Sequence, residues 1–580
     1  MNQAGVYHRP ESEFAYLYKQ QRVHLRIRTA KNDVELVRVH VVDPYLFNQP
    51  AAIRMLEMQR IAQGVCHDYW QVSLTMPHQR LMYFFELMKD QVAYFYGEKG
   101  FFSFDNFANP SDYFRLPYLH EIDRFDAPEW VKETIWYQIF PERFANGDPT
   151  ISPKGSLAWE DSPVLSSNKF YGGDLRGLIQ HLDDLSALGI NGIYLCPIFE
   201  SPSNHKYDTI NYYEIDSHFG TKEVFAELVQ AAHQRGIRIM LDAVFNHIGV
   251  RSPQWQDVLL HGPNSRYYDW FHIQHWPMDE VFNIENPAYH TFAFVEKMPK
   301  LNTANPEVAD YLIDIAKYWI ETFDIDGWRL DVANEIDHAF WKRFRREVLA
   351  VKSDVFILGE IWHNSQSWLN GDELDSVMNY AYTDYIKEYF IDQTLSTAAF
   401  IERLADYEML YRRQTVEVMF NLLDSHDTQR VMTAANGNVA AVQSAFAFLF
   451  LMTGSPCIYY GTEIGMEGAH DPDCRRVMLW DRVAQKGELY QWFVALIQLR
   501  KQYQPTITYQ APRIEWDNTR LVVSFDDVDE ENHQLIAIWN RTDNRAIEVP
   551  NMERILLHHQ VGQGNNVLPQ GCLIYLARKD

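Results

Sequence analysis

The sequence has few cysteines, a shortage of positive charge and no long apolar run, and each shortage excludes something. Its five cysteines are scattered over 580 residues without metal-ligand spacing, which favours reduced thiols in a cytoplasm over a disulfide framework. A formal net charge of −26 argues against nucleic acid or an anionic membrane as a partner, because both attract basic surfaces. No apolar run approaches the roughly 20 residues that span a bilayer. The first residues lack the basic and apolar segments of a signal peptide, so none is expected.

Aromatic residues, in contrast, are abundant and make up 14% of the chain, with 16 Trp and 33 Tyr. Sugars present flat apolar faces with hydroxyls at their rims, and aromatic rings complement both features. A neutral substrate of this kind also fits the acidic composition. A large aromatic core is the alternative explanation, and composition alone leaves both open.

At this length the chain is expected to hold three or more domains. Residues 1–124 alternate apolar and polar side chains with a period of two, as in "RVHLRIRTA", which predicts a β-sandwich of immunoglobulin-like size. Residues 125–503 alternate apolar strands with amphipathic helices, and eight such strands predict an α/β fold, a (β/α)8 TIM barrel. A small inserted domain at about 249–303 shows no helix pattern of its own. Residues 504–580 return to strand alternation and predict a C-terminal β-sandwich domain.

The segment "DGWRLDVANEI" places a cation and a carboxylate in an otherwise apolar strand. Arg329 and Asp331 lie two residues apart, so on a strand their side chains point to the same side. A fixed cation holds a neighbouring carboxylate in its ionised form. A buried structural ion pair explains this segment, and so does a carboxylate kept charged to act as a nucleophile.

Polar residues at four predicted strand ends decide between these alternatives. Barrel enzymes build their sites at the C-terminal ends of the strands. The residues concerned are Asp242, Asn246 and His247 after the third strand, Arg329 and Asp331 after the fourth, Glu360 after the fifth, and His426 and Asp427 after the seventh. Carboxylates at one rim, without cysteines or a histidine cluster, suit glycoside hydrolysis, which needs one carboxylic acid and one attacking carboxylate. Repulsion and burial raise the pKa of one carboxyl group, while Arg329 keeps another ionised.

Four segments at these positions closely resemble the motif regions of the α-amylase family of retaining glycoside hydrolases. They are "DAVFNH" (242–247), "GWRLDVANE" (327–335), "ILGEIWH" (357–363) and "NLLDSHD" (421–427), within a resemblance that covers residues 132–505. The resemblance implies that Asp331 is the nucleophile, Glu360 the acid/base and Asp427 a stabiliser of the transition state. Asp427 would act through the sugar hydroxyls beside the reacting carbon.

The same resemblance implies a set of substrate-binding residues. Positions around the ring that is cleaved correspond to His205, Tyr207, Asp242, Asn246, His247, Arg329 and His426, with Tyr207 stacked beneath the ring. Positions on the leaving-group side correspond to Phe292, Glu335 and Trp362, and positions on the glycone side correspond to Tyr380, Asp471 and Arg475. For Phe292 and Trp362, simple packing is an equally good explanation.

Three further features are similar to one group within this family, the neopullulanases, cyclomaltodextrinases and maltogenic amylases. They are "MPKLN" (298–302), the "VANE" ending of the second motif (332–335) and the additional N-terminal β domain. The resemblance implies hydrolysis of α-1,4-glucosidic bonds in cyclodextrins, maltooligosaccharides, pullulan and starch, with some transglycosylation, and within the group it favours a cyclomaltodextrinase. It also implies a homodimer, and the aromatic stretches "YFFELM" and "VAYFYGEKGFF" are expected to expose an apolar interface. A glucosidase, a sucrose-active transferase, a branching enzyme and a non-catalytic carbohydrate-binding relative are the alternatives.

The chemistry itself requires no cofactor, but members of this group often bind a structural calcium ion. The resemblance places its ligands at Asn146, Asp148, Gly172 and Asp174. Ile151 and Ser152 stand where residues richer in oxygen occur in the group. Because calcium takes six to eight oxygen ligands, we expect the site to be weak or empty.

Overall fold

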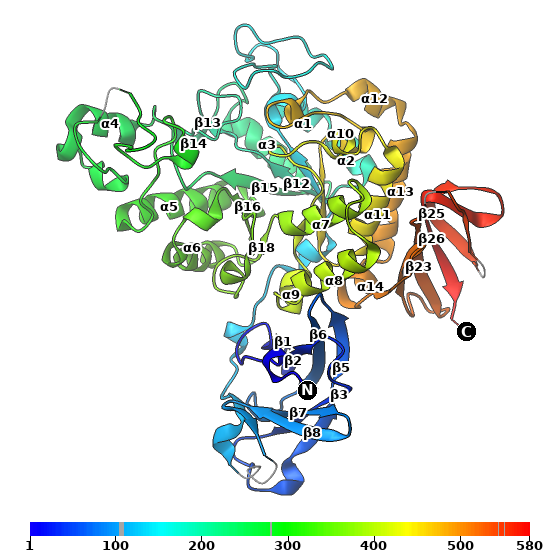
Figure 1. Cartoon of the computed structure of the whole chain (residues 1–580). Helices are drawn as coiled ribbons and strands as arrows, with labels where there is room; N and C mark the ends of the chain where they lie inside the picture. Colours follow the sequence, from blue (N-terminus) through cyan, green and yellow to red (C-terminus); the bar gives the residue numbers. More distant parts are fainter. Residues whose placement is uncertain (104–108, 279–280, 543, 550–551, 580) are drawn as a thin grey trace. The chain divides into compact units, whose positions relative to one another are not determined.

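The computed structural model describes residues 1–103, 109–278, 281–542, 544–549 and 552–579. These residues form two compact units, each of which is described separately. The first consists of Met1–Asp126, Leu369–Gly371 and Thr394–Val416. The second consists of Ala127–Trp368, Asp372–Gln393 and Glu417–Asp580. The elements are labelled in Figure 1.

The first unit is built on two antiparallel sheets, which confirms the predicted N-terminal β-sandwich. One sheet has the order β1-β2-β6-β5 and the other β4-β3-β7-β8-β9, with β10 paired to β7. The strands are β1 (Ala15–Lys19), β2 (Arg22–Ala30), β3 (Leu36–Val42), β4 (Arg54–Glu57), β5 (Gln59–Gln63), β6 (His67–Thr75), β7 (Leu81–Lys89), β8 (Val92–Gly97), β9 (Gly100–Phe102) and β10 (Phe114–Leu116). Alternate side chains of β2 and β3, such as Leu25 and Val39, share one buried core.

Strand β7 corrects the prediction that "YFFELM" exposes an apolar interface. Tyr83 and Phe85 lie in the core of the sandwich. Phe84, between them, is also fully buried, because it packs into a second cluster with Phe95 and Tyr113. Both faces of the strand are therefore covered. The exposed apolar side chains of this unit include three consecutive residues of the loop after β3, Tyr45, Leu46 and Phe47.

Two helices from a distant part of the sequence complete this unit, α8 (Thr397–Glu408) and α9 (Arg413–Val416). Asp406 of α8 accepts hydrogen bonds from the Val65 backbone N–H at 2.8 Å and from the Tyr69 hydroxyl at 2.9 Å. Lys31 pairs with Glu402 at 2.7 Å. The β domain is thus joined to a segment that lies between the sixth and seventh barrel strands.

The second unit contains the barrel, and its eight strands are all parallel, as predicted. Their order is β18-β17-β16-β15-β12-β11-β20-β19, and a bridge between Met378 and Phe420 joins the two ends of the sheet. The strands are β11 (Trp136–Ile139), β12 (Gly192–Leu195), β15 (Arg238–Ala243), β16 (Gly327–Leu330), β17 (Phe356–Gly359), β18 (Ser376–Val377), β19 (Phe420–Asn421) and β20 (Ser455–Tyr459). The side chains of β16 and β17 are entirely buried.

Helices follow the barrel strands, and many of them begin with a recognisable N-cap residue. In α5 (Pro306–Phe323), for example, the Asn305 side chain accepts a hydrogen bond from the Glu307 N–H at 2.9 Å, and proline occupies the first helical position. The remaining barrel helices are α1 (Leu175–Gln180), α2 (Leu182–Leu188), α3 (Lys222–His233), α6 (His338–Val351), α7 (Tyr380–Phe390), α10 (Val431–Ala434), α11 (Val439–Leu451), α12 (Trp480–Gln485), α13 (Glu488–Gln502) and α14 (Gln504–Tyr509). In the part of the chain that the structure describes, no helix is long and apolar enough to cross a membrane.

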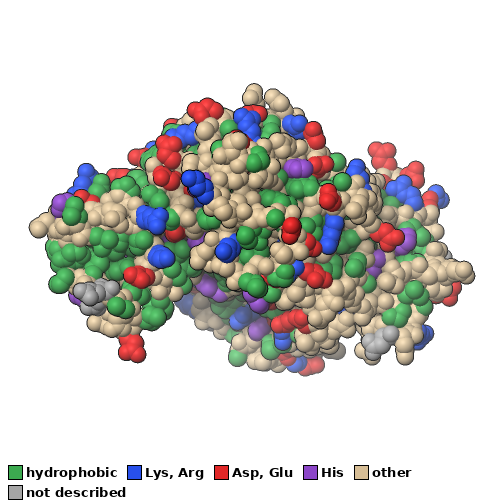
Figure 2. Space-filling model, turned by 90° about the horizontal axis from the view of Figure 1, so that it is seen from above, with side chains coloured by type: hydrophobic (Ala, Val, Ile, Leu, Met, Phe, Trp, Pro, Cys, Tyr) green, Lys and Arg blue, Asp and Glu red, His purple; other side chains and the backbone are tan. Residues whose placement is uncertain are grey.

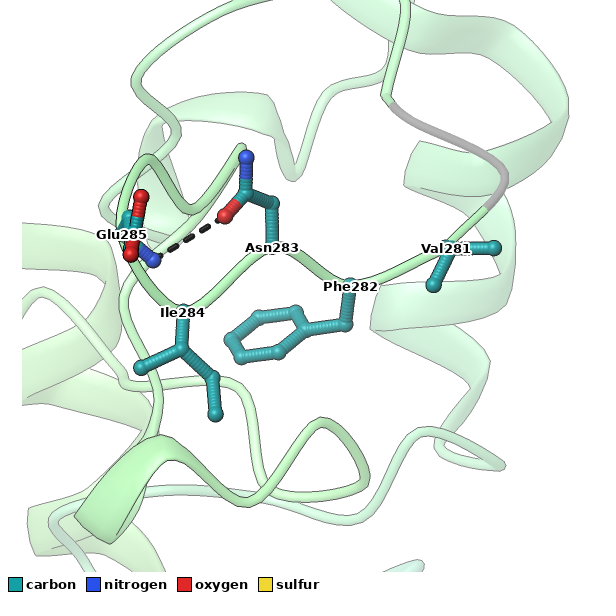
Figure 3. Close-up of a pocket in the computed structure, with 5 residues that line it drawn as sticks. All are labelled: Val281, Phe282, Asn283, Ile284 and Glu285. Atoms are coloured by element: carbon teal, nitrogen blue, oxygen red, sulfur yellow. Dashed lines mark hydrogen bonds between the residues drawn. The ribbon is translucent and has the colours of Figure 1, made fainter.

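The inserted stretch 249–303 contains a helix, so the prediction that it has none is wrong. Helix α4 (Pro253–His261) begins at Ser252, whose hydroxyl accepts a hydrogen bond from the Trp255 N–H. The serine and the proline after it form a helix start that the sequence displays. Nearby, Val281–Glu285 line a cavity of about 630 Å³, and Figure 3 shows the Asn283 side chain accepting a hydrogen bond from the Glu285 N–H.

The C-terminal region is a β domain, as predicted, and its strands pair into one sheet rather than two. The order is β21-β22-β23-β26-β24, with β25 also paired to β26. The strands are β21 (Arg513–Trp516), β22 (Arg520–Phe525), β23 (His533–Asn540), β24 (Ile547–Glu548), β25 (Arg554–Val561) and β26 (Asn566–Arg578). The sheet packs on α11, where the Trp539 indole N–H donates to the Ser444 carbonyl at 3.2 Å. Acidic and basic side chains are interspersed over the face shown in Figure 2.

Candidate active site

One buried guanidinium, that of Arg329, joins three carboxylates at the end of the barrel. Its Nη1 atom lies 3.0 Å from Asp242 Oδ2 and 2.7 Å from Asp331 Oδ1. Its Nη2 atom lies 2.9 Å from Glu360 Oε2, close enough for an ion pair but without the angle of a hydrogen bond. All four side chains are buried. The two nitrogens of one planar group therefore place Asp331 and Glu360 side by side.

Strand register explains why these residues meet. Asp242 of β15 is paired with Arg329 of β16, and Arg329 is paired with Leu358 of β17, two residues before Glu360. Immediately after Asp331 the chain turns through Val332, whose φ of 47° is unusual for a β-branched residue. The turn directs the Val332 N–H to Glu360 Oε2 at 3.1 Å.

Protonation within this cluster differs from the simple sequence argument. Burial raises the pKa of Asp331 well above its usual range, although the attraction of Arg329 opposes the shift. Burial likewise raises the pKa of Asp242 to about 6, again opposed by Arg329. Asp242 and Asp331 contact the same guanidinium nitrogen, so the protonation of one aspartate affects the pKa of the other. Arg329 therefore opposes the effect of burial on Asp331, as predicted, but burial, which the sequence argument did not weigh for this residue, is the larger influence on its pKa.

A chain of hydrogen bonds links the aromatic and histidine residues to this cluster. In the tautomer assigned here to His426, the Gln138 amide donates to His426 Nδ1 at 2.6 Å. His426 Nε2–H then donates to the Tyr207 hydroxyl oxygen at 2.5 Å, and that hydroxyl donates to Asp242 at 3.1 Å. The rings of Tyr207 and His426 are nearly parallel, at 4° and 5.5 Å. Burial lowers the pKa of His426 well below its usual value, so the imidazole is neutral.

Two further histidines of the site are also neutral. Burial lowers the pKa of His205 to about 4 and that of His247 to about 3. His205 stacks loosely on Tyr207, with ring centres 6.0 Å apart. His247 Nε2 donates to the Tyr207 carbonyl at 3.1 Å, and its ring stacks on Phe292 at 5.0 Å. Neutral imidazoles leave the cluster without added positive charge.

Asp427 lies at the open side of the site, with 29% of its side chain exposed. Arg475 Nη2 contacts Asp427 Oδ1 at 3.1 Å, and Arg475 Nη1 contacts Asp471 at 2.8 Å. Arg475 Nε donates to the His426 carbonyl at 2.8 Å. The arginine thus fixes Asp427 beside the histidine chain while leaving carboxylate surface free for a ligand.

Two stacked aromatic side chains, Trp362 and Tyr380, form another part of the site. Trp362 is 49% exposed and stacks on Tyr380 with ring centres 3.7 Å apart at 4°. Its indole N–H donates to Glu360 Oε1 at 3.2 Å. Simple packing in a core does not explain Trp362, because its ring is half-exposed and donates a hydrogen bond to Glu360. Tyr380 itself is buried, and its hydroxyl lies 3.1 Å from the Ser425 hydroxyl.

Three residues with direct contacts to the site were missed in the sequence. The Tyr194 hydroxyl donates to Asp242 at 2.6 Å, and Gln138 orients His426. Lys300 donates to Asn246 and pairs with Glu335 at 2.9 Å. A signal was available for each: Tyr194 and Gln138 are polar residues inside short apolar strands, and Lys300 is the single charge of "MPKLN".

The four candidate calcium ligands are brought together, but few of their oxygens are available. Both oxygens of Asp174 accept backbone N–H groups: Gly177 at 2.7 Å, Asp148 at 2.8 Å and Gly147 at 3.0 Å. Asp148 Oδ1 accepts from Thr150. Asn146 Oδ1 is buried without a partner, which favours a cation, whereas its amide nitrogen donates to Ser152 Oγ at 3.0 Å. The donors do not supply the six to eight oxygens that calcium takes.

Chelation is therefore expected to leave this protein unaffected. EDTA should change the melting temperature by less than about 1 °C, because an ion that does not bind adds no stability. The measurement is thermal unfolding with EDTA and with millimolar CaCl₂. As the matched control, a variant carrying Ile151→Asn and Ser152→Asp should become calcium-dependent. A large drop in melting temperature on chelation of the unaltered chain would contradict the expectation.

Comparison with known proteins agrees with this geometry. Residues 138–489 match the model described as "Alpha amylase, catalytic domain", and residues 1–120 match "Alpha amylase, N-terminal ig-like domain". The chain belongs to the α-amylase family and is a glycoside hydrolase.

Its relatives are of the group indicated by the sequence. The chain is 50% identical to "Intracellular maltogenic amylase" from Bacillus subtilis, over 89% of this chain and 87% of that protein. It is 49% identical to "Cyclomaltodextrinase" from Geobacillus thermopakistaniensis (strain MAS1), over 95% of this chain and 93% of that one. Among solved structures, one titled "Cyclomaltodextrinase" matches with a TM-score of 0.90 and 40% identity, covering 100% of this chain and 98% of the other.

Proposed function

We propose that this enzyme hydrolyses α-1,4-glucosidic bonds with retention of configuration, and that cyclodextrins and maltooligosaccharides are its preferred substrates. The observation that carries the mechanism is the contact of Asp331 and Glu360 with the two nitrogens of Arg329. Carboxyl groups that share one guanidinium are expected at the separation of about 5–5.5 Å of a retaining enzyme, rather than the about 6.5–9.5 Å that an inverting enzyme needs for its water. Relatives named as cyclomaltodextrinase and maltogenic amylase support the substrate class.

Each residue of the site has a separate role in the reaction. Glu360 donates a proton to the glycosidic oxygen while Asp331 attacks the anomeric carbon, so that the bond to the leaving sugar breaks and a glycosyl ester forms. Glu360, now ionised, removes a proton from water, which attacks the same carbon and releases Asp331. Asp427 accepts hydrogen bonds from hydroxyls beside that carbon, and Tyr207 supports the ring. Transglycosylation results when a sugar hydroxyl replaces the water.

Substrate preference and stereochemistry are tested together. Initial rates on β-cyclodextrin, pullulan and soluble starch should rank β-cyclodextrin first, and proton NMR of early products should show the α anomer. Appearance of the β anomer would overturn the retaining assignment of Asp331 and Glu360. A ranking led by pullulan would favour a neopullulanase, and one led by starch a maltogenic amylase. Products with new α-1,6 branches would indicate a branching enzyme.

We further propose that the enzyme acts in the cytoplasm as a homodimer and that its reaction needs no cofactor. All five cysteines are among the described residues and none is in a disulfide, which suits a reducing compartment. The relative named "Intracellular maltogenic amylase" supports the location. For the dimer, the support is the exposed apolar loop Tyr45–Phe47, in which Tyr45 is 76% exposed.

A double variant at this loop tests the dimer. Tyr45→Ser with Phe47→Ser is expected to shift the chain from dimer to monomer in sedimentation velocity and to lower activity on β-cyclodextrin relative to starch. As the matched control, Ile555→Ser removes an exposed apolar side chain in the C-terminal sheet and should change neither. A monomeric double variant with an unchanged cyclodextrin-to-starch ratio would separate dimer formation from substrate choice. An unaltered chain that sediments as a monomer would end the proposal.

A further inference from the structure

A second cavity lies on the second unit. It measures about 340 Å³ and is lined by Ala145, Asn146, Leu157, Trp159, Tyr171, His181 and Trp480. These residues come from the long loop after β11, from the junction of α1 and α2, and from the first position of α12, elements that lie close together in Figure 1. None of them belongs to the catalytic cluster.

The aromatic walls of this cavity are held rigidly. The Trp480 ring stacks on His181 with centres 3.4 Å apart at 9°, and its indole N–H donates to the Phe144 carbonyl at 2.7 Å. The Trp159 indole N–H donates to the Met478 carbonyl at 2.9 Å. Both indoles are fixed through their nitrogen atoms, so their apolar faces are positioned without any ligand. Leu157, 43% exposed, forms part of the rim.

The chemistry of the lining selects a neutral ligand. Among the described residues that line the cavity, none is an aspartate, glutamate, lysine or arginine. Two indoles and a phenol offer flat apolar surface, and Asn146 and His181 add polar groups. A pyranose ring has the same division into apolar faces and polar edges. The volume lies at the lower end of the about 300–1,000 Å³ that is usual for small-molecule sites.

Arg143 contacts one residue of this cavity and one residue of the active site. It is 1% exposed, and its Nη1 donates to the carbonyl of Arg475, the residue that fixes Asp427, at 2.7 Å. Its guanidinium carbon lies 4.7 Å from the centre of the Tyr171 ring, which lines the cavity. A sugar in the cavity would not be cleaved there, because Asp331 and Glu360 are not among the residues that line it.

We propose that this cavity is a second, non-catalytic binding site for one or two glucose units of an α-glucan. The choice of glucan as the ligand rests on the proposed function. A long chain held by one segment at Trp159 and Trp480 stays near the enzyme while another segment enters the active site. A compact cyclodextrin gains nothing from this, because it has no distant segment.

The binding test uses the full chain carrying Asp331→Asn, which keeps the active site but blocks cleavage. Titration calorimetry with maltotriose should give two sites per chain. Adding Trp159→Ala should remove one site and leave the affinity of the other unchanged. Leu157→Lys, at the exposed rim, should weaken the same site without disturbing the buried packing of Trp480. Trp516→Ala, an exposed tryptophan in the C-terminal sheet, is the matched control and should retain both sites.

The active enzyme gives a second readout. Trp159→Ala should raise KM for soluble starch several-fold, with kcat and the rate on β-cyclodextrin unchanged. If maltotriose binds at one site only, and neither Trp159→Ala nor Leu157→Lys changes that binding, the proposed second site is wrong. The proposed function would not be affected by this result. Absence of any maltotriose binding to the Asp331→Asn chain would instead count against the proposed function itself.

Discussion

An Arg329→Met variant is expected to lose about 3–5 kcal/mol of folding free energy together with all measurable hydrolysis. Removal of the guanidinium leaves Asp242, Asp331 and Glu360 buried against one another with no cation among them. The carboxyl groups must then take up protons or let water into the barrel. The pKa values of Asp242 and Asp331, which burial already raises, then rise further, so the folded state binds more protons than the unfolded state, and stability falls as pH increases. The measurement is chemical and thermal unfolding at pH 5 and pH 8, with the larger loss expected at pH 8.

Two comparison variants define what Arg329 does. Arg329→Lys keeps the charge but cannot contact Asp331 and Glu360 with a planar fork, so it should recover part of the stability and little of the activity. Arg343→Met removes a half-exposed arginine paired with Asp310 at 2.5 Å and Glu347 at 2.7 Å, and should cost less than about 1 kcal/mol. If Arg329→Met and Arg343→Met lowered the free energy of unfolding by the same amount, the stability of the carboxylate cluster would not depend on its cation.

Asp331→Asn is expected to reduce hydrolysis by on the order of 10⁴-fold or more, and to make the folded protein more stable at pH 7. The activity falls because an amide cannot form the glycosyl ester. The stability rises because folding raises the pKa of Asp331, which means that its charged form is disfavoured in the folded state. Arg329 retains Asp242 and Glu360 as partners in the variant.

The pH dependence follows from the direction of these shifts. Folding raises the pKa of Asp331, and it raises the pKa of Asp242 to about 6, above the ordinary value of 3.8 for aspartate. Below about pH 4 both folded and unfolded chains are protonated at these groups, so the variant gains nothing there. As pH rises above about 4 the unaltered chain loses stability, because the unfolded chain then releases the Asp331 proton more readily than the folded chain, so the gain from Asp331→Asn should grow. Differential scanning calorimetry at pH 4 and pH 7 measures this change.

Asp326→Asn is the matched control, with the opposite sign. Burial of Asp326 would raise its pKa, but the bonds from His233, Lys352 and Arg238 outweigh burial and lower that pKa to about 2. Its charge therefore stabilises the fold above about pH 4, and Asp326→Asn should lower the melting temperature at pH 7. If Asp331→Asn also lowered it, the assignment of a raised pKa to Asp331 would be wrong.

Glu360→Gln should regain activity on substrates with activated leaving groups, which need no proton donor, whereas Asp331→Asn should not.

The alternation of strands and helices was sufficient to predict the barrel and the strand ends that carry the candidate site. Arg329 and Asp331 are two residues apart on and just after one strand, so their contact at 2.7 Å followed from local geometry. Burial of "YFFELM" on both faces could not be predicted in the same way. Its outer cover comes from Phe95 and Tyr113, and a period-two pattern does not show whether a second layer lies beyond a strand.

The sequence by itself determined the order of the elements and the residue types at each strand end, because both depend on neighbours along the chain. Only the tertiary structure decided which distant groups share a charge or a proton. Asp242 meets Arg329 across 87 residues and Tyr207 meets His426 across 219, through strand register and closure of the barrel. Barrel closure also excludes water, and that desolvation outweighs the nearby guanidinium in raising the pKa of Asp331. The pKa of Asp331 therefore depends on all the elements that surround it in the closed barrel, and no local segment of the sequence contains them.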